Sequence, residues 1–598
     1  KIIDSKGKVI TFNYKRDYMH CNFFFSNSSV TSSFQDLKWS NNGWFVDKYK
    51  KSGSSSNFES VNPNSLYGSF VYPMYLSSIE TDEQIISFNS DVANTLNYDY
   101  KIISANRQSQ YGTNYGSGGY ATLGEADDFN KYFKFKKLTS LNVTSKITNK
   151  IVKNYIFEYT EGNNIRFSLK NLYDYGNQLQ TNQVLPQKNY SFQYDDIISL
   201  KQYGGNYTDH WGFFNNKDIG YLYSTVFANK ETDKNFVTKG LITEIKYPTG
   251  GFTKFVWEAH DHSRVLAESK DNLIPYYGYA GGSRIKKMSN YTKVGELANE
   301  KEYLYVTGFD SKKALNTLTS SGVLNGKPRY DFSFSNYIGW YGKTTFSFSM
   351  SGVNSSVNYS STGNGSHIGY DEVVEVNSDK TYTKHFFTNY GNDINGIAHF
   401  DKIPLAFTGW KIGDQSVYMN FSSLESERGK NIGIYDFSNN DILVRKINYT
   451  FRDDPNRFDV FEKELRVMDS YYGTVDVLVF ATATKKFTYN YYPIKKETVT
   501  YDLNGLNPIA TTISYKYNAR NNILSEQTTI SRSADYITTK YFYPYDLMSE
   551  PYMSNLVDNY LISAAVVKEN YINDVLLSQS KTSYAKDATT NNLVLPKA

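Results

Sequence analysis

Hydrophobic and polar positions alternate with a period of two along most of the chain, and the segment 242–264 shows this clearly. In its sequence, ITEIKYPTGGFTKFVWEAHDHSR, the residues Ile245 and Tyr247 before a turn and Phe255 and Trp257 after it form one apolar face. Such alternation predicts β-strands, because successive side chains of a strand point to opposite faces. The intervening PTGG combines a proline of fixed φ with two glycines that are free to adopt positive φ. We therefore predict a β-hairpin that depends on its glycines rather than on its histidines.

Similar alternation continues through most of the sequence, whereas helical patterns are few and short. They occur at 311–322, which Gly322 would end, and at 554–565. The stretch 329–366 begins with alternating aromatic residues and continues with a Ser/Asn/Gly-rich run, which indicates a loop or excursion. The pattern as a whole predicts an all-β fold of consecutive antiparallel hairpins. The other strand-like regions are 138–160, 303–308, 371–389 and most of 432–545.

Tyrosine-containing triplets recur every 26 residues in the C-terminal third of the sequence. They begin at Tyr489, Tyr515 and Tyr541 (515 − 489 and 541 − 515). A unit of this length fits two strands of about ten residues and two turns, and such units bury a continuous face only by stacking on one another. The patterns divide the chain into four predicted regions. These are an N-terminal β region at 1–137, a hairpin region at 138–328, a β region with a Ser/Asn/Gly-rich insertion at 329–430, and a repeat region at 431–598.

The composition agrees with a strand-rich chain and argues against several kinds of partner. The 598 residues include 55 tyrosines, and aromatic residues, which favour strands, reach 17%. The formal net charge of +4 is spread along the sequence rather than collected in a block, so we expect no nucleic-acid partner. A single cysteine, Cys21, rules out an internal disulfide framework. No apolar run approaches about 18 residues, so we expect a chain that does not span a membrane by helices.

His260 and His262 are candidate metal ligands, because alternate residues of one strand point to the same face. At a rise of about 3.3 Å per residue they would lie roughly 6 to 7 Å apart. A zinc site needs a third and usually a fourth ligand, and neither Cys21 nor any other histidine lies at a ligand-like spacing from the pair. The alternative, which we favour, is that the pair occupies a half-exposed strand end.

Asp209, His210 and Trp211 are candidates for an acid–base pair beside an aromatic ring that stacks on a sugar. The alternative is a loop held by side-chain hydrogen bonds with Trp211 as its core anchor, and the glycine and aromatic residues that follow favour this second interpretation. Trp340 and Tyr341 are further candidates for stacking on sugar rings. In a chain this rich in aromatic residues, however, most such side chains pack across strands.

Two oxygen-rich loops, 393–396 and 436–441, are candidates for binding calcium. Neither has the spaced series of ligands of a known calcium-binding loop, and we predict no other cofactor. The sequence contains no Gly-x-Ser-x-Gly elbow, phosphate-binding loop or Cys/His nucleophile pair. We therefore predict no catalytic residues.

A series of motifs extends through the middle of the chain. Its members are DHWGFFN at 209–215, IKYPTGGFTKF at 245–255, GGSRIK at 281–286, SSGVLNGKPRYDF at 320–332, HIGYDEVVEV at 367–376 and ERGKNIGIYDF at 427–437. In this order they resemble the Rhs-like large surface proteins of Bacteroidota, and the segment 501–527 is similar to the Tyr-Asp-x-x-Gly hairpin, or YD repeat, of the Rhs family. Strict repeats of that form are scarce, and the carboxy-terminal Rhs core with its self-cleavage motif and downstream toxin is not visible.

The resemblance implies hairpins stacked as a YD-repeat-like sheet or shell in a protein exported to the cell surface. The leading hypothesis is a non-enzymatic scaffold whose partners are other cell-surface or outer-membrane proteins, or surface glycans. One alternative is a glycan-binding or glycan-processing surface protein, which needs two carboxylates and an aromatic platform that converge in space. The other is a hollow shell around a cargo or toxin segment. Because the sequence begins at Lys1 without a signal region, we expect a processed or partial product of a longer chain.

Overall fold

The computed structural model shows a chain that is 52% strand and 7% helix, which confirms the predicted all-β fold with few short helices. Within the described residues, no helix combines the length and the apolar character that crossing a membrane requires. The description covers residues 1–598 except 4–8, 36, 41–42, 47–57, 97, 99–130, 178–187, 204–206, 218–228, 268, 329–330, 338–344, 352–365, 410–420, 473–474, 531–534, 591 and 598.

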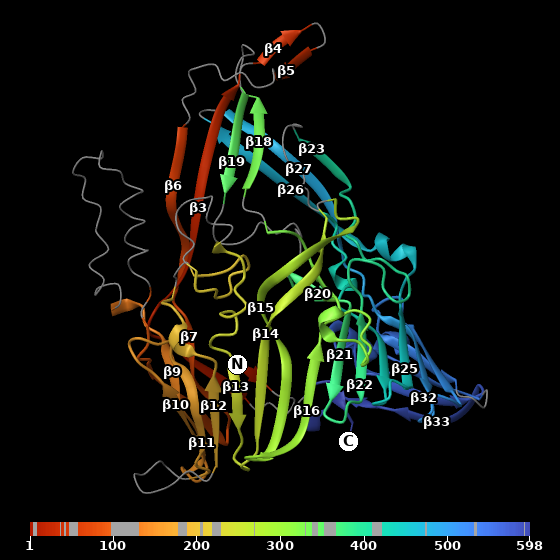
Figure 1. Ribbon diagram of the computed structural model, residues 1–598. Coiled ribbons are helices and arrows are strands. Elements are labelled where there is room, and N and C mark those ends of the chain that lie inside the picture. Colours follow the sequence, from red (N-terminus) through yellow and green to blue (C-terminus); the bar gives the residue numbers. More distant parts are fainter. Residues whose placement is uncertain are drawn as a thin grey trace.

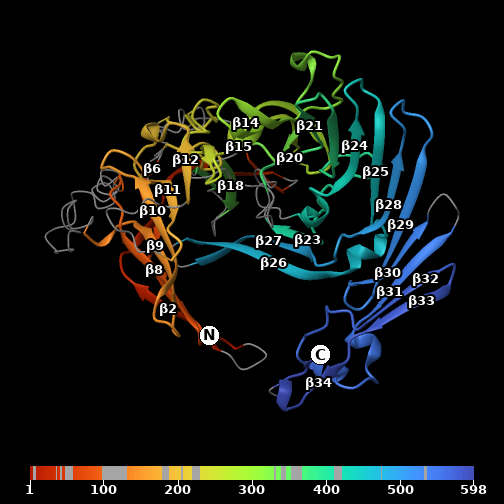
Figure 2. The same ribbon diagram turned by 90° about the horizontal axis from the view of Figure 1, so that it is seen from below.

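One sheet of 24 strands dominates the molecule, and it contains strands from all four predicted regions. Each strand pairs antiparallel with the next one in the series, so the sheet grows hairpin by hairpin along the sequence (Figure 1). Seen from below, the series bends into an arc whose open side holds both chain ends (Figure 2). The strands in series are β1 (Ile2–Ile3), β2 (Val9–Arg16), β7 (Met74–Glu80), β8 (Gln84–Val92), β9 (Lys136–Ser145), β10 (Ile151–Thr160), β11 (Ser168–Asp174), β12 (Lys188–Tyr194), β13 (Ile242–Lys246), β14 (Phe252–Leu266), β15 (Leu273–Lys293), β16 (Glu296–Leu304), β21 (Glu372–Asn377), β22 (Tyr382–Phe387), β24 (Asn431–Phe437), β25 (Leu443–Phe451), β28 (Pro493–Thr500), β29 (Ile509–Tyr517), β30 (Leu524–Ile530), β31 (Tyr536–Phe542), β32 (Val567–Ile572) and β33 (Val575–Lys581).

The two edges of this sheet differ in their connections. Because successive antiparallel strands run in opposite directions, alternate connections fall on the same edge. The edge that we call the turn edge carries short reversals, such as 247–251, 294–295 and 573–574. The opposite edge, which we call the excursion edge, carries all the long insertions. These excursions are 17–73, 93–135, 195–241, 305–371, 388–430, 452–492 and 543–566.

Excursions that are far apart in the sequence pair with each other above the main sheet (Figure 1). One small sheet has the order β18-β19-β3-β6 and joins the first excursion to the excursion 305–371. Another has the order β23-β27-β26 and joins the excursions on either side of β24 and β25. Two short strands, β17 and β20, attach the excursion 305–371 to β14. The bounds are β3 (His20–Gln35), β4 (Leu37–Ser40), β5 (Gly43–Val46), β6 (Phe58–Val71), β17 (Gly322–Leu324), β18 (Asp331–Tyr337), β19 (Thr345–Ser351), β20 (Ile368–Tyr370), β23 (Ala406–Gly409), β26 (Phe461–Tyr472), β27 (Val475–Phe487), β34 (Tyr584–Ala585) and β35 (Leu595–Pro596).

The helical predictions are confirmed only in part. The segment 311–322 contains a single 3-10 turn, η2 (Leu315–Thr317), and its last residue already starts β17, so the predicted helix is wrong. The segment 554–565 contains α4 (Met553–Asp558), which buries Met553 and Leu556 and ends early. The other short turns are η1 (Ile197–Ser199), η4 (Glu425–Glu427), η5 (Pro455–Asp459), η6 (Pro544–Leu547) and η7 (Ala588–Thr590).

An aromatic side chain closes the open end of six hairpins at the excursion edge. Tyr517, at the end of β29, donates its hydroxyl hydrogen to the carbonyl of Pro493 at the start of β28, over 2.8 Å. Tyr543 makes the same contact with Leu524 one hairpin later, again over 2.8 Å, so the 26-residue spacing marks equivalent positions here. Tyr489 does not belong to this series, because it lies in the excursion 452–492. The other donor–acceptor pairs are Tyr159–Leu138, Tyr194–Leu169, Tyr305–Ile285 and Trp257–Ile242.

The hairpin predicted at 242–264 is present, and both of its glycines occupy positions that disfavour a Cβ, for different reasons. Gly250 has φ +92°, a left-handed conformation that side chains with a Cβ disfavour. A Cβ on Gly251 would lie 2.8 Å from the carbonyl oxygen of Tyr291 on the neighbouring strand. The predicted strand end at His260 and His262 is wrong, because β15 pairs with β14 beyond both residues and the strand continues to Leu266.

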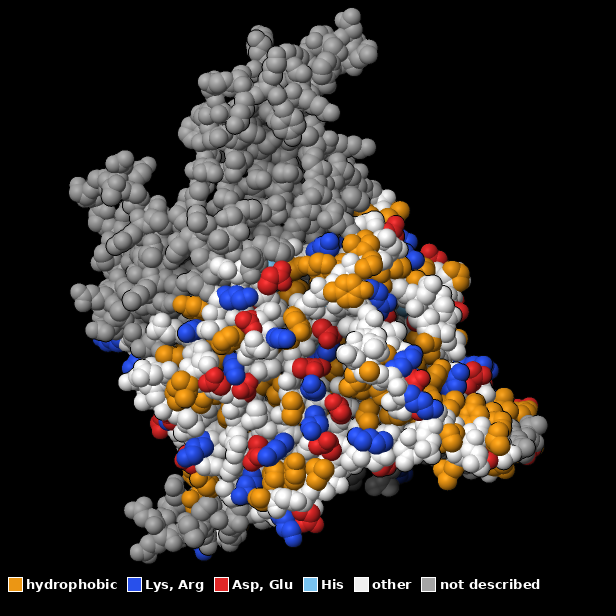
Figure 3. All heavy atoms as spheres, in the orientation of Figure 1, with side chains coloured by type: hydrophobic (Ala, Val, Ile, Leu, Met, Phe, Trp, Pro, Cys, Tyr) orange, Lys and Arg blue, Asp and Glu red, His pale blue; other side chains and the backbone are white. Residues whose placement is uncertain are grey.

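The described part of the outer surface mixes positive and negative side chains, as Figure 3 shows for one face. Several of these charges pair across neighbouring strands. Glu244 and Lys254, which are directly opposite each other, lie 3.8 Å apart, and Lys516 and Glu526 lie 2.6 Å apart. Exposed ion pairs of this kind contribute little to the stability of the fold. We therefore regard these charges as side chains that face solvent.

Candidate functional sites at the excursion edge

Asp209 organises the first of the predicted sites, a loop in the excursion 195–241. Its Oδ1 accepts hydrogen bonds from the backbone N–H groups of Trp211 (3.0 Å) and Phe213 (2.9 Å), and its Oδ2 accepts one from the Thr232 hydroxyl (2.8 Å). The carboxylate is completely buried, and burial raises its pKa despite these bonds. A Cβ on Gly281 would lie 2.7 Å from Oδ2, so this glycine lets the loop contact β15.

His210 and Trp211 anchor the same loop to the sheet. The backbone N–H of His210 donates to the carbonyl of Lys230 over 3.0 Å, and its Nε2 lies 3.5 Å from a carboxylate oxygen of Glu231. The Trp211 ring stacks on His367 with ring centroids 5.0 Å apart. It also packs against the buried cluster of Val265, Ala280, Leu324 and Ile368. The arrangement is that of a loop held by side-chain hydrogen bonds with a tryptophan anchor.

His260 and His262 lie within β14 beside this loop, and both imidazoles have protein partners. The Nδ1 atom of His260 is 2.8 Å from the Tyr370 hydroxyl, and that of His262 is 2.8 Å from the carbonyl of Tyr276, whose ring stacks on it. Burial, together with the charge of Arg284, lowers the pKa of His260 to about 4. In the part of the chain that the structure describes, no group of three or more His, Cys, Asp or Glu side chains is placed to hold a metal ion.

Arg284, from the GGSRIK motif, connects the motifs of β14 and β20. Its guanidinium donates two hydrogen bonds to Asp261, the residue between the two histidines, over 2.9 and 3.0 Å. It donates a third to Glu258 over 2.8 Å and a fourth to the Tyr370 hydroxyl over 2.7 Å, and it stacks on Tyr305 at 4.1 Å. The bidentate contact with Asp261 joins β15 to β14, and the bond to Tyr370 adds β20, so Arg284 positions three strands relative to one another.

The two candidate calcium loops use their carboxylates internally. Asp393 Oδ1 accepts hydrogen bonds from two backbone N–H groups of its own loop, over 2.7 and 3.1 Å. The Asp441 carboxylate accepts hydrogen bonds from two hydroxyl groups, over 2.7 and 2.9 Å. Trp340 and Tyr341 lie outside the described residues.

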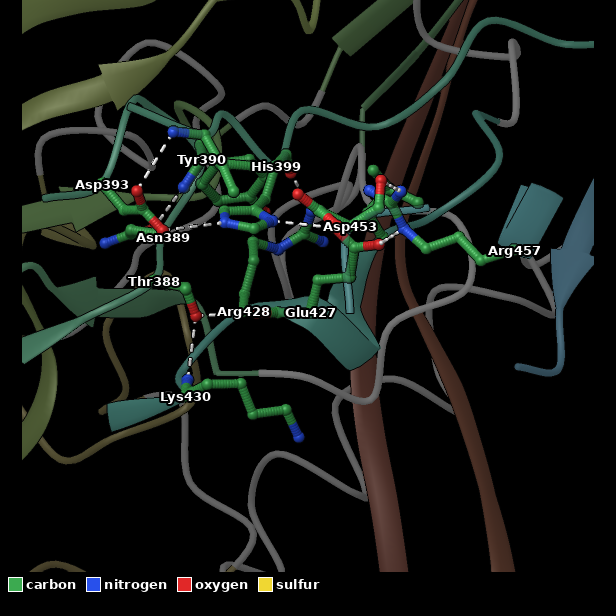
Figure 4. Close-up of polar contacts among 12 residues, drawn as sticks. Thr388, Asn389, Tyr390, Asp393, His399, Glu427, Arg428, Lys430, Asp453 and Arg457 are labelled. Atoms are coloured by element: carbon green, nitrogen blue, oxygen red, sulfur yellow. Dashed lines mark hydrogen bonds and ion pairs between the residues drawn. The ribbon is translucent and has the colours of Figure 1, made fainter. Parts of the chain in front are cut away.

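A buried charged network, which the sequence patterns did not reveal, joins two neighbouring excursions (Figure 4). At its centre is Glu427, which is fully buried at the end of η4. Its carboxylate accepts hydrogen bonds from His399 Nδ1 (2.8 Å), Arg457 Nε (2.8 Å) and the Tyr489 hydroxyl (2.5 Å). The other ring nitrogen of His399 lies 3.5 Å from Asp393 Oδ2. Arg457 and Tyr489 come from the excursion that follows β25, so the network fixes the two excursions to each other.

The network shifts the pKa values of its members in opposite directions. Burial alone raises the pKa of Glu427, but hydrogen bonds from His399, Arg457 and Tyr489 outweigh it and hold the pKa at about 2. Burial lowers the pKa of His399, but its bonds to Asp393 and Glu427 outweigh that and raise the pKa above its ordinary value. Both shifts favour the charged forms of Glu427 and His399, whose charges compensate each other inside the protein.

A second ion pair lies beside the network. Arg428 donates to Asp401 Oδ1 over 2.7 Å and to the carbonyl of His399 over 2.9 Å, and its guanidinium lies 4.1 Å from the ring centre of Tyr390. Figure 4 shows Arg428 between Asn389 and Tyr390 on one side and Glu427 and Arg457 on the other.

Arg428 lines a pocket of 410 Å³ between the excursions 305–371 and 388–430. The polar side chains in its wall come from short segments at the ends of β17, β20, β22 and η4. The wall also contains three aromatic rings, which give it apolar surface. The lining residues are Val323, Asn325, Ser366, Ile368, Gly369, Tyr370, Val373, Phe387, Thr388, Asn389, Tyr390, Glu425, Arg428 and Gly429.

No sequence pattern predicted the network or the pocket, because their residues are far apart in the sequence. His399 and Arg457 belong to no motif with a recognisable spacing, and they meet Glu427 between two excursions that also pair through β23 and β27. The one available signal was ERGKNIGIYDF, which begins with Glu427 and Arg428. That motif contributed to the family resemblance, but it gave no indication of buried charge.

The sequence matches no known protein family, and no curated protein matches it. Three crystal structures with detectable similarity are those of TcdB2-TccC3-Cdc42, TcdB2-TccC3-TEV and TcdB2-TccC3. Identity is 8%, 10% and 10%, the TM-scores are 0.29, 0.10 and 0.09, and the matches cover 98%, 84% and 67% of this chain. They span 33%, 24% and 20% of those longer chains. At these TM-scores the likeness supports no conclusion, and the fold rests on the described sheet itself.

Proposed function

We propose that this chain is a non-enzymatic scaffold of Rhs-like type at the surface of the cell that exports it, and that it holds other surface or outer-membrane proteins. The observation that carries the proposal is the pairing of distant excursions above one edge of a continuous sheet. Loops on such a frame are held in fixed positions, which suits a surface that presents binding segments.

The use of the ionisable side chains supports the same function. His260 bonds Tyr370 of β20 and His262 bonds the carbonyl of Tyr276 on β15, while the Asp209 carboxylate accepts bonds from N–H groups of its own loop. Glu427 and His399 neutralise each other inside the protein. These side chains hold the excursions in place on the sheet, which is a structural role and agrees with a scaffold.

Labelling of intact cells tests the location and the partners together. A membrane-impermeant, lysine-directed cross-linker should react with Lys293 and Lys312, whose side chains are 77% and 79% exposed. It should join them to outer-membrane or surface proteins. Lys230, which is fully buried, is the internal control and should stay unlabelled while the protein is folded. Labelling of the two exposed lysines only after cell lysis would refute the surface location, and surface labelling without cross-linked partners would refute the scaffold role.

A hollow shell around a cargo is the second candidate, and the curvature of the main sheet favours it (Figure 2). The arc has a concave side towards which the excursion containing β26 and β27 extends. A solution-scattering envelope of the full natural protein separates the two functions. A closed envelope with low central density would support the shell, and an open envelope would support the scaffold alone.

A further inference from the structure

The pocket between the excursions 305–371 and 388–430 has the chemistry of a ligand site that is separate from the scaffold. Its volume of 410 Å³ falls within the range of about 300 to 1,000 Å³ that is usual for small-molecule sites. Its residues come from excursions whose positions are fixed by β17, β20 and the Glu427 network. The pocket is therefore formed before any ligand arrives.

A buried donor in the pocket wall points to a ligand. Asn389 is 6% exposed, and its Oδ1 accepts a hydrogen bond from the backbone N–H of Tyr390 over 3.0 Å. Among the described residues, its Nδ2 has no hydrogen-bond partner. A buried amide donor left unsatisfied costs stability, so its position in the wall of a pocket indicates that a ligand oxygen satisfies it. Gly369 leaves room for this amide, because a Cβ there would lie 3.1 Å from Nδ2.

The charges in the wall select against an ionic ligand. The lining contains one cation, Arg428, and one carboxylate, Glu425. Arg428 is already neutralised by Asp401 at 2.7 Å, and Glu425 adds a second negative charge near it. An anion such as phosphate would meet no uncompensated positive charge, and a cation would meet the guanidinium.

The remaining wall combines rings with planar polar groups. Tyr370 and Phe387 present aromatic surface, while Asn389 and Glu425 present an amide and a carboxylate. The Tyr390 ring supports the wall from behind, because it is only 5% exposed and is covered by the Arg428 guanidinium. A pyranose ring matches this combination, because its C–H face packs on aromatic rings while its hydroxyl groups both donate and accept hydrogen bonds. We propose that this pocket binds one neutral sugar unit of a glycan, with Asn389 donating to a ring or hydroxyl oxygen and Glu425 accepting from a hydroxyl group.

Ligand-observed NMR with the full chain tests the proposal. The probes are the methyl glycosides of glucose and galactose and N-acetylglucosamine, with galacturonate and inorganic phosphate as charged comparators. We expect saturable binding of at least one neutral probe with a dissociation constant on the order of 1 mM. Both comparators should bind more weakly.

Two variants locate the binding. Asn389→Asp keeps the acceptor for the Tyr390 N–H and removes the donor, and Glu425→Ala removes the carboxylate from a half-buried position. Each should weaken binding of the neutral probe about tenfold, which corresponds to the loss of one well-made hydrogen bond. The matched controls are Asn392→Asp, an exposed asparagine of the same excursion, and Glu462→Ala, whose side chain is 68% exposed. Neither control should change binding.

Three results would overturn the proposal. They are the absence of saturable binding by every neutral probe, preferential binding of either charged comparator, and unchanged binding in Glu425→Ala. Thermal unfolding shows whether Asn389→Asp is folded, and Glu425→Ala decides the matter if it is not. None of these results bears on the surface labelling that tests the scaffold.

Discussion

The turn edge and the excursion edge of the main sheet are built by different physical means. At the turn edge, hairpins reverse through residues with positive φ, such as Gly250, Lys380 and Asp574, and each reversal depends on its own few residues. At the excursion edge, insertions of tens of residues are fixed by buried charge pairs, and aromatic donors that reach backbone carbonyls close the ends of the hairpins. The comparison teaches that the repeat supplies a regular frame, while the elements that distinguish this chain depend on buried polar contacts between segments distant in sequence.

The largest effect is expected at the centre of the excursion edge. Glu427→Gln keeps the shape of the side chain but removes the charge that compensates His399 and Arg457. Breaking a buried ion pair from one side costs about 3 to 5 kcal/mol of the free energy of unfolding, measured by urea denaturation. The control Glu462→Gln removes an exposed charge 3.7 Å from Lys486 and should cost less than about 0.5 kcal/mol. Equal costs would show that the network is not a structural centre.

The pH dependence of that cost sharpens the first prediction. The pKa of Glu427 is lowered to about 2, so its contribution is present above its ordinary value of 4.5 and is lost as the pH falls through about 2. The pKa of His399 is raised, so its contribution is present below its ordinary value of 6.5 and is lost as the pH rises through the folded value. The difference between wild type and Glu427→Gln should therefore be largest between pH 4.5 and 6.5. A difference that does not vary with pH would contradict the ionised pair.

A smaller effect is expected at the turn edge. Gly251→Ala places a Cβ 2.8 Å from a backbone oxygen, which cannot move as a flexible side chain can, and should cost about 2 kcal/mol. Gly250→Ala meets no atom within 4 Å and should cost about 1 kcal/mol from its positive φ alone. Unfolding midpoints measured side by side compare the two, and a larger cost at Gly250 would contradict the steric argument.

The hairpin-closing tyrosines should contribute less individually. Tyr517→Phe removes the hydrogen bond to the Pro493 carbonyl while the ring stays in place, and should cost about 1 kcal/mol. Tyr541→Phe is the matched control. The Tyr541 ring contacts Lys568, and this contact does not need the hydroxyl group that the substitution removes. Denaturant unfolding of both variants gives the comparison. If the two variants are equally stable, the hydroxyl contact does not hold the hairpin end.

The smallest effect has the opposite sign. Lys380 has φ +67° in the turn between β21 and β22, where a glycine avoids the penalty of a Cβ. Glycine also loses more conformational entropy on folding, which offsets part of this gain. The net effect of Lys380→Gly should be a stabilisation of about 0.5 kcal/mol. The same substitution at Lys293, within β15, should destabilise it. A Lys380→Gly variant with a lower thermal midpoint than the wild type would contradict the prediction.

The sequence predicted features that depend on neighbouring residues and missed those that depend on distant ones. Period-two alternation at 242–264 predicted the hairpin because strand faces are set locally. The strand end assigned to His260 and His262 was wrong because pairing with β15, which follows in the sequence, extends β14. Helix propensity at 311–322 was overridden, since the tertiary contacts of β17 with β14 and β20 determine its end.

The candidate site was predicted least well. The glycine and aromatic residues that follow Asp209 and Trp211 favoured a loop held by side-chain hydrogen bonds, and Asp209 does accept hydrogen bonds from two N–H groups of this loop. The Glu427 network and the pocket at Asn389 need three segments to meet, and no local pattern encodes such a meeting. Sequence alone therefore shows where strands and turns lie, and the structure is needed to show which side chains share a buried environment.

The pairing of β3 with β19 has a consequence for biosynthesis. The partners Gln35 and Thr345 are separated by 310 residues (345 − 35), whereas even the widely separated partners Lys301 and Asn377 of the main sheet are only 76 residues apart (377 − 301). At about 5 to 20 residues per second, synthesis of the intervening chain takes roughly 15 to 60 s. During that interval one edge of β3 lacks the strand that covers it in the folded protein, and unpaired strand edges promote aggregation. We expect the nascent chain to need a chaperone on its first excursion until residue 351 has been made.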